Sequence, residues 1–304
     1  MRIFRSLAIV AAAMCLSPTI APTIAHAQDD SNSATLTPHV LAPNLVVISG
    51  AGGNSTLLWG PDGSLVVDGK MRDAAPSLQA AIAATGAPPA RILLNTHWHG
   101  DHSGGNAAFA RAGAIVMAHE NIRTRLEAAM ADAENHLSAA DLPTLIWQAG
   151  VNLTLNGQHI RVIHIPRAHT DGDSIVYFAE ANVIAMGDNY LRAIALPFTD
   201  MESGGNALGM LDAANAALAL ANPQTRFVPG HGLVASHAEM LRHRDQLAAV
   251  IDAVRTARAE GKTLAQILTL NLDRLYPINQ SFLTGEEFVT SIYDSLNQQA
   301  AQSN

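Results

Sequence analysis

Three histidines and an aspartate lie within six positions of the chain, in the segment HWHGDH at residues 97–102, directly after an apolar run. A titratable cluster at the end of a buried strand is costly to desolvate unless something compensates it. A bound metal would do so, because neutral imidazole and carboxylate are ligand types that zinc accepts. We expect His97 and His99 to point one way, and Asp101 and His102 toward an adjacent point. The segment therefore predicts parts of two neighbouring metal sites.

The rest of the metal shell must come from elsewhere, because four-coordinate ions need more ligands than this one loop offers. A histidine or carboxylate follows a predicted strand at three further places, namely His169, Asp188 and His231. Glycine lies near each of them, so the backbone can turn sharply there and approach a ligand. Binding sites are usually assembled from loops held at strand ends. These three side chains are therefore predicted to complete the shell.

Such a site needs a scaffold that brings the ends of separate strands together. Apolar runs and turn signals predict strands at 44–49, 55–60, 64–69, 90–95, 114–118, 151–155, 159–166, 174–179, 182–187 and 226–229. Helical spacing predicts helices at 73–85, 103–111, 121–136 and about 207–220, with more helices from residue 237 to the end. Ser103 is expected to cap the second helix, and Asn156-Gly157 to form a type I′ hairpin turn.

The order of these elements is strands, then strand and helix in alternation, and then the same sequence again. Two similar halves predict an α/β (α+β) fold in which two mixed β-sheets face each other with helices outside, a four-layer αββα sandwich. We see no linker that would separate two domains. Residues 39–304 are therefore predicted to form one domain that ends in C-terminal helices, after a flexible, polar leader at 28–38.

Residues 1–27 have the features of a secretory signal peptide, with two arginines, a short apolar stretch and a cleavage site after Ala27. A periplasmic or secreted protein is the expected product. The chain's one cysteine, Cys15, lies in this segment, so the mature core must hold without disulfides, which a chain of this size can do. A lipid-modified Cys15 is the alternative, but the bulky Met14 before it fits that poorly.

The net charge and the hydropathy of the chain exclude some classes of binding partner. Loss of Arg2 and Arg5 from the 18 basic residues leaves 16 against 26 acidic ones, a formal charge of −10 with neutral histidines. This balance argues against nucleic-acid or anionic-membrane partners. No segment has about 18 consecutive uncharged apolar residues, so stable membrane insertion is not expected. A small-molecule substrate is the expected partner, and the sequence leaves the oligomeric state open.

The segment THWHGDH, followed by His169, Asp188 and His231, resembles the metallo-β-lactamase fold superfamily. The pattern of that family is HxHxDH, a second histidine, a bridging carboxylate and a last histidine, and the likeness extends from about residue 45 to residue 231. The resemblance implies an αββα sandwich with two zinc ions along one edge of the sheets. It also implies ligands for the first metal (His97, His99, His169), for the second (Asp101, His102, His231) and between them (Asp188).

For several nearby residues, both a role in the site and an ordinary structural role are possible. Asp68, at the end of the strand predicted at 64–69, resembles an aspartate that steadies the ligand loop in this family, but it could equally shape a turn. Trp98 either lines the site or packs below it. The 196–206 loop, with Phe198 and Asp200, forms either a wall over the metals or an ordinary surface loop.

Two further residues follow the bridging aspartate, and we predict that Asn189 and Tyr190 donate a hydrogen bond to the developing oxyanion. The remaining histidines of the mature domain are expected to be ordinary hydrogen-bonded residues, because a lone histidine after a strand seldom binds a metal (His39, His119, His136, His159, His164, His237 and His243). The C-terminal helices carry apolar residues at helical spacing and are expected to cover the core.

Paired zinc ions lower the pKa of a shared water toward about 7, so no protein nucleophile is needed. Asp101 is predicted to orient that water and receive its proton. A serine hydrolase is disfavoured, because the chain has no G-x-S-x-G elbow. The sequence thus predicts an exported dizinc hydrolase of a cyclic amide or ester, with β-lactams tested first and then lactones or other esters.

One feature departs from that choice of substrate. By family resemblance, zinc β-lactamases lack an aspartate at the bridging position, whereas glyoxalase II, lactonases and related branches have one. Asp188 therefore favours thioesters, lactones or phosphoesters. The alternatives are a thioester hydrolase of glyoxalase II type, an iron-dependent persulfide dioxygenase with iron in place of zinc, and a non-catalytic zinc-binding protein.

Overall fold

The computed structural model describes residues 35–279 and 281–302. The predicted signal peptide at 1–27 lies outside these residues, as does the leader up to residue 34. Among the described residues, no helix is both long and apolar enough to cross a membrane.

The N-terminal sheet has seven strands in the order of the sequence. These strands are β1 (Thr37–Ala42), β2 (Leu45–Ser49), β3 (Ser55–Leu58), β4 (Ser64–Val67), β5 (Ala90–Leu94), β6 (Ile115–His119) and β7 (Leu145–Trp147). The strands from β1 to β4 are antiparallel, and those from β4 to β7 are parallel. The first strand of the described residues thus begins at Thr37, slightly before the expected start of the domain near residue 39.

The second sheet has six strands in the order β13-β12-β11-β10-β9-β8. Its strands are β8 (Gly150–Leu155), β9 (Gln158–His164), β10 (Ser174–Phe178), β11 (Val183–Ala185), β12 (Arg226–Val228) and β13 (Ala235–Ser236). Only the β11–β12 pair is parallel. The β8–β9 turn has positive φ at both Asn156 (50°) and Gly157 (74°), as a type I′ turn requires.

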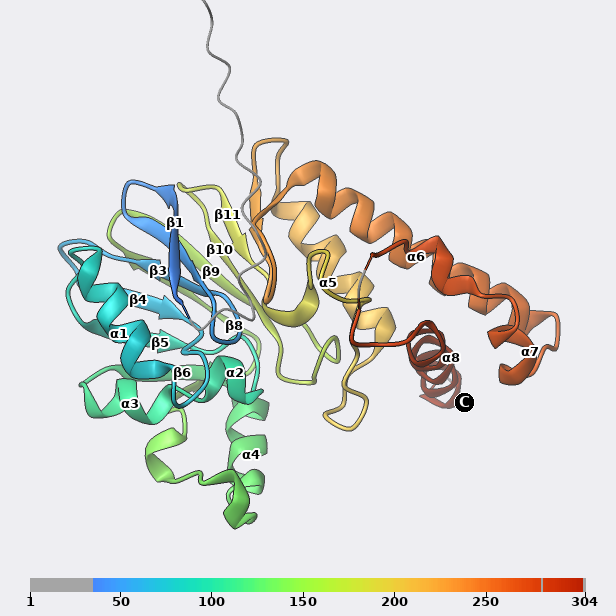
Figure 1. Cartoon of the computed structure of the whole chain (residues 1–304), viewed down its shortest axis with the longest axis horizontal. Helices are drawn as coiled ribbons and strands as arrows, with labels where there is room; N and C mark the ends of the chain where they lie inside the picture. Colours follow the sequence, from blue (N-terminus) through green and yellow to red (C-terminus); the bar gives the residue numbers. More distant parts are fainter. Residues whose placement is uncertain (1–34, 280, 303–304) are drawn as a thin grey trace, which may run out of the picture.

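The helices are α1 (Ala75–Ala84), α2 (Gly100–Ser103), α3 (Asn106–Arg111), α4 (Glu120–Ala129), α5 (Ala207–Leu220), α6 (His237–Ala259), α7 (Leu264–Leu268) and α8 (Gly285–Gln302). Short 3-10 turns lie at η1 (Ala133–Asn135), η2 (Ala139–Asp141), η3 (Gly187–Asn189) and η4 (Leu272–Leu275). Figure 1 shows α1 to α4 beside the first sheet and α5, α6 and α8 beside the second.

Alternation along the strands sorts the core into layers. In β2, Val47 packs with Phe178 of β10 between the two sheets, whereas its neighbour Val46 packs with Leu78 of α1 on the opposite face. A third cluster joins the outer face of the second sheet to α5, α6 and α8, as expected for these C-terminal helices. The predicted αββα sandwich of two mixed sheets is therefore confirmed.

The predicted helix at 103–111 is wrong at its start, and Ser103 is not its cap. The chain forms α2 and α3 separately, and the Ser103 hydroxyl donates to the carbonyl oxygens of Trp98 and His99. The break falls at Gly105, where a Cβ atom would lie 2.2 Å from the carbonyl oxygen of Gly69. Close packing of this backbone on the segment after β4 therefore ends α2.

The predicted helix at 121–136 is also too long, since α4 ends at Ala129. Beyond it, the Asp132 carboxylate accepts from the backbone N–H of Glu134, and the Asn135 side chain donates to the carbonyl of Ala129. Asp and Asn side chains compete in this way with helical hydrogen bonds. The rest of the segment is a turn and the 3-10 turn η1.

Candidate metal centre

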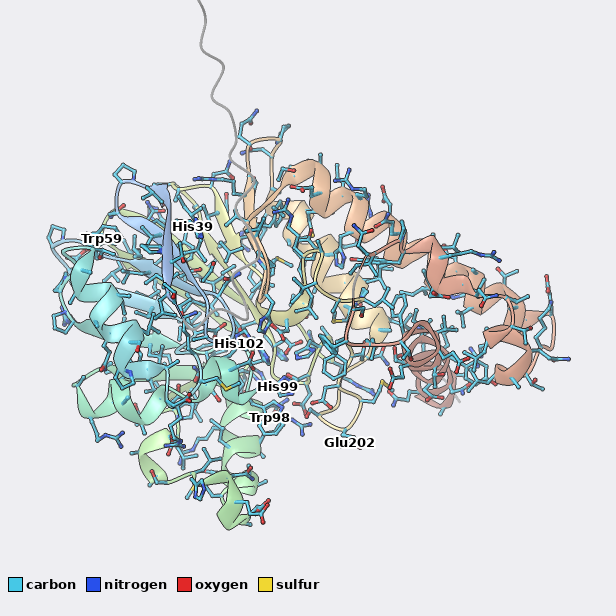
Figure 2. The ribbon with its side chains drawn as sticks, viewed as in Figure 1. His39, Trp59, Trp98, His99, His102 and Glu202 are labelled. Carbon is cyan, nitrogen blue, oxygen red and sulfur yellow. The ribbon has the colours of Figure 1, made fainter. Side chains whose placement is uncertain are left out.

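The loop after β5 meets three other loops at one edge of the two sheets. His169 lies between β9 and β10, Asp188 lies in η3 after β11, and His231 follows β12. The ends of β5, β11 and β12 meet at this edge, so segments remote in sequence become neighbours. Figure 2 shows His99 and His102 near the middle of the molecule, with His39 apart from them on β1.

The seven predicted side chains converge in two adjacent groups. One group contains His97, His99, His169 and Asp188, the other contains Asp101, His102 and His231, and within each group the ligand atoms lie within 4.8 Å of one another. In the first, His99 Nδ1 is 2.9 Å from His169 Nε2. In the second, His231 Nε2 is 2.8 Å from Asp101 Oδ2 and 3.4 Å from His102 Nε2.

Asp188 lies between the two groups. One carboxylate oxygen is 3.9 Å from His97 Nε2 and 3.8 Å from both His169 Nε2 and His231 Nε2, and the other is 3.1 Å from His102 Nε2. It therefore reaches histidines of both groups, as a bridging carboxylate must.

Burial gives the first group the protonation state that a metal needs. Desolvation, with the nearby charge of His102, holds the pKa of His97 well below its usual value. Desolvation also lowers the pKa of His169 to about 4. Both rings are therefore neutral at physiological pH and keep a free lone pair. Burial opposes ionisation of Asp188, but the charges of His102 and His231 outweigh it and lower its pKa.

The second group carries the protons of the cluster. Burial works against a charge on His102, but Asp101, Asp188 and Asp68 outweigh it and raise its pKa. Burial likewise opposes ionisation of Asp101, and the charge and hydrogen bonds of His102 and His231 keep its pKa below the usual range. A metal bound in this group must displace a proton, since His102 carries one in its absence.

Donor chemistry shows that these residues fit a metal. His97 Nε2 is buried and has no hydrogen-bond partner, although it faces the carboxylate of Asp188. The ring nitrogens of His99 and His169 face each other at a distance that needs a shared proton or cation. Imidazole and carboxylate groups that converge in this way form an arrangement that zinc accepts.

A model of the metallo-β-lactamase superfamily matches residues 48–256 of the chain. The chain belongs to the metallo-β-lactamase superfamily. No curated protein sequence matches it. Together with the cluster, this membership makes the protein a hydrolase of that superfamily with a histidine and aspartate metal-binding site.

Solved structures share the superfamily fold at low identity. A metallo-β-lactamase from Pontibacter korlensis is 18% identical with a TM-score of 0.60, and the match covers 70% of this chain and 99% of that one. DIM-1 metallo-β-lactamase is 16% identical with a TM-score of 0.57, over 70% and 97%. The stereoselective inverting sec-alkylsulfatase Pisa1 from Pseudomonas sp. is 16% identical with a TM-score of 0.64, and the match covers 85% of this chain and half (50%) of that one.

Asp68 contacts the ligand loop of this metallo-β-lactamase superfamily member, as the functional interpretation of this residue requires. It is buried after β4, and its carboxylate accepts from the backbone N–H of Thr96 at 2.7 Å and from the Thr96 hydroxyl at 2.8 Å. The same carboxylate is 2.8 Å from His102 Nδ1. This contact keeps a proton on Nδ1, so the proton that a metal displaces is the one on His102 Nε2, which faces the cluster.

The 196–206 loop contacts the cluster and is more than a surface connection. Asp200 Oδ2 is 2.8 Å from His99 Nε2, which leaves His99 Nδ1 directed at His169. The carbonyl oxygen of Phe198 accepts from His169 Nδ1 at 2.8 Å. Trp98 packs against the small cluster beside α4 and donates to Ser203 Oγ at 3.1 Å, as its packing interpretation requires.

Asn189 and Tyr190 do not take the predicted positions of oxyanion donors. The Asn189 amide donates one N–H to the carbonyl of Met186 and accepts from the backbone N–H of His169, and both contacts hold the loop. Tyr190 belongs to the core under α6, with its ring centroid 4.6 Å from that of His243. Sequence adjacency to Asp188 was misleading because η3 turns the chain away from the cluster at this point.

Sequence reasoning also missed the residues that join the loops to one another. Lys70 is fully buried, and its ammonium donates to the carbonyl oxygens of Ile48 (3.0 Å) and Gly53 (2.7 Å). Burial lowers its pKa to about 7. The Asn54 side chain donates to the carbonyls on either side of the His231 turn, those of Pro229 and Gly232. No local pattern marks either residue, because their partners are remote in sequence.

Gly230 shows how tightly these loops pack. A Cβ atom at this position would lie 1.9 Å from Asp188 Oδ1 and 2.7 Å from the carbonyl carbon of Gly187. Any larger residue must therefore displace the carboxylate that connects the two groups.

Proposed function

We propose that this chain is an exported, zinc-dependent hydrolase that cleaves a cyclic amide or ester in a small molecule. The convergence of its seven metal-ligand side chains, with the unpartnered Nε2 of His97 facing the carboxylate of Asp188, supports the proposal best. His97, His99 and His169 would hold one zinc, and Asp101, His102 and His231 the other, with Asp188 between them. When bound, the two ions would supply an activated water at neutral pH and polarise the scissile carbonyl.

Asp101 takes the proton-handling role in this proposal. Its side chain is 21% exposed and so lies on the accessible side of the cluster, where a substrate can reach it. Its low pKa keeps it ionised, so the carboxylate can orient a water by accepting a hydrogen bond. The side chain of His231 is also partly exposed, and its Nε2, 2.8 Å from Asp101 Oδ2, holds this carboxylate in place.

The positioning of the ligands falls to the surrounding protein. Asp68 fixes the ring of His102 and Asp200 fixes that of His99, so that the nitrogens directed at the cluster are set before any metal arrives. Lys70 and Asn54 hold the glycine loop at 50–53 and the His231 turn in place. Preorganised ligands of this kind lower the cost of binding and limit the orientation of the substrate.

The substrate panel follows from the fold and from the site. Similar structures include β-lactamases and a sec-alkylsulfatase, so β-lactams come first and an alkyl sulfate belongs in the panel. The carboxylate at Asp188 adds lactones, other esters, thioesters and phosphodiesters. We further propose that a signal peptide at 1–27 directs the protein to the periplasm or outside the cell, which N-terminal sequencing of the secreted product tests.

Elemental analysis of the purified mature protein, combined with turnover of this panel, tests the proposed function. We expect about two zinc ions per chain and hydrolysis of at least one ester or amide class. One iron with oxygen consumption on a persulfide would replace the proposal by a dioxygenase. Metal bound without turnover of any panel member would leave a non-catalytic binding protein.

A further inference from the structure

The apolar surroundings of the cluster point to the chemical class of its substrate, and this inference rests on the proposed function. Seven large apolar side chains are exposed among the described residues, and for two of them the contacts lead to the cluster. Phe282 is 66% exposed and packs on Phe198, which contacts His169 of the first group, whereas Met71 is 46% exposed and lies near Gly52, as does Asp101 of the second group.

Phe282 continues a line of rings that starts at the cluster. The ring centroid of Phe198 is 5.4 Å from that of His169, and the ring centroid of Phe282 is 5.7 Å from that of Phe198. Both contacts are edge-to-face, a favoured geometry for aromatic pairs. His169 is fully buried, Phe198 is half-buried and Phe282 is exposed, so the line leads from a metal ligand to solvent.

The position of Phe282 is fixed by hydrogen bonds rather than left to a free loop. The hydroxyl oxygen of Ser281 accepts from the backbone N–H of Leu196, in the loop that carries Phe198, at 3.0 Å. The same oxygen accepts from the N–H of Leu283, also at 3.0 Å. The segment before α8 is therefore attached to the 196–206 loop, which itself supports His99 and His169.

Met71 places a second apolar side chain beside Asp101. A Cβ atom on Gly52 would lie 3.1 Å from Asp101 Cβ and 3.4 Å from Met71 Cγ, so both side chains pack on this one glycine. An exposed apolar side chain is thus connected to each half of the cluster, Phe282 through Phe198 and Met71 across Gly52.

We propose that Phe198 and Phe282 form a subsite for an apolar alkyl or aryl group of the substrate, so that the preferred substrates are esters or lactones with such a group. Burial of an exposed aromatic ring against an apolar chain is favourable in proportion to the area removed from water. A short, polar acyl group would leave Phe282 in solvent and gain nothing from it.

Paired measurements on Phe282→Ala test the subsite. The protein as purified is titrated calorimetrically with octanoate and with acetate, and kcat/KM is measured for the p-nitrophenyl esters of both acids. We expect Phe282→Ala to reduce the preference for the octanoyl compound on the order of 10-fold while leaving the acetyl compound unchanged. Ser281→Ala should reduce it less. Leu275→Ala, another exposed apolar residue at 40% exposure, is the matched control and should change neither value.

The two readouts separate the possible failures. Octanoate binding that depends on Phe282, with no turnover of any panel member, would keep the subsite and remove the proposed hydrolase function. Ester turnover with the same octanoyl preference in Phe282→Ala and in the unmodified protein would keep the function and overturn the subsite. Equal affinity for octanoate and acetate in the unmodified protein would overturn it as well.

Discussion

Histidines occupy two kinds of region in this protein, and their ring nitrogens have different neighbours in each. At the cluster, ring nitrogens of His99 and His169 face each other, and His97 Nε2 faces the carboxylate of Asp188 without a hydrogen-bond partner. Elsewhere, His119 and His164 are stacked at 3.7 Å, with ring nitrogens bonded to the carbonyls of Gln148 and Asp173. The first arrangement needs a shared proton or a cation, whereas in the second the protein's own carbonyl oxygens accept from the rings.

The difference shows that burial of a histidine does not make a metal site. His243 is as buried as the ligand candidates and its Nε2 has no hydrogen-bond partner, yet its Nδ1 is 2.6 Å from the Tyr276 hydroxyl and it lies among core residues. Convergence of several donors is what distinguishes the cluster. Four predictions test this comparison, from the largest expected effect to the smallest.

Asp101→Asn should lower kcat on the order of 10³-fold, because an amide keeps the shape of the carboxylate but cannot accept a proton. Circular dichroism should show that the fold stays intact, since the side chain is partly exposed and the amide has the same shape. Steady-state kinetics on whichever panel substrate is cleaved provide the measurement. Full activity in this variant would remove Asp101 from the mechanism.

His243 should affect stability with pH rather than metal binding. Burial lowers its pKa to about 4 from an ordinary value near 6.5, so the folded state favours the neutral ring. This contribution is fully present above pH 6.5 and is lost as the pH falls toward 4, by about 3 kcal/mol. In His243→Phe, urea unfolding should show a smaller loss of stability between pH 7 and pH 4, with unchanged metal content. An identical loss in both proteins would contradict the assignment.

Asp68→Asn should weaken metal binding about 10- to 100-fold. The amide N–H would face His102 Nδ1 and favour the tautomer with the proton on Nε2, which blocks the nitrogen directed at the cluster. Competition with a chelator measures the dissociation constant. Wild-type affinity in Asp68→Asn would mean that this aspartate serves the turn alone.

Asp200→Asn should weaken metal binding by about 10-fold or less. It makes the equivalent contact to His99, but its side chain is 17% exposed and that of His99 is 22% exposed, so water can replace the lost hydrogen bond. The same chelator competition applies. A larger loss of metal affinity than in Asp68→Asn would show that Asp200 contributes more to metal binding than Asp68, and would contradict this account.

Much of the site could be predicted because its residues follow strands that end at one edge. The role of Asp68 became clear only from pairing, since β4 and β5 are parallel with Val67 beside Leu94, which sets Asp68 next to the start of the ligand loop. The direction of Tyr190 and the contact of Asp200 with His99 depend on how loops fold back across the sheets. The break at Gly105 has the same origin, because its cause is the approach of Gly69.

Anomalous X-ray diffraction from crystals of the native protein, collected at the zinc absorption edge, tests the central claim most directly. We predict two peaks, one in each group, with ligand atoms of the seven side chains at about 2.0–2.2 Å. A site without zinc peaks, or peaks at the stacked His119 and His164 or at His243 instead, would contradict the account.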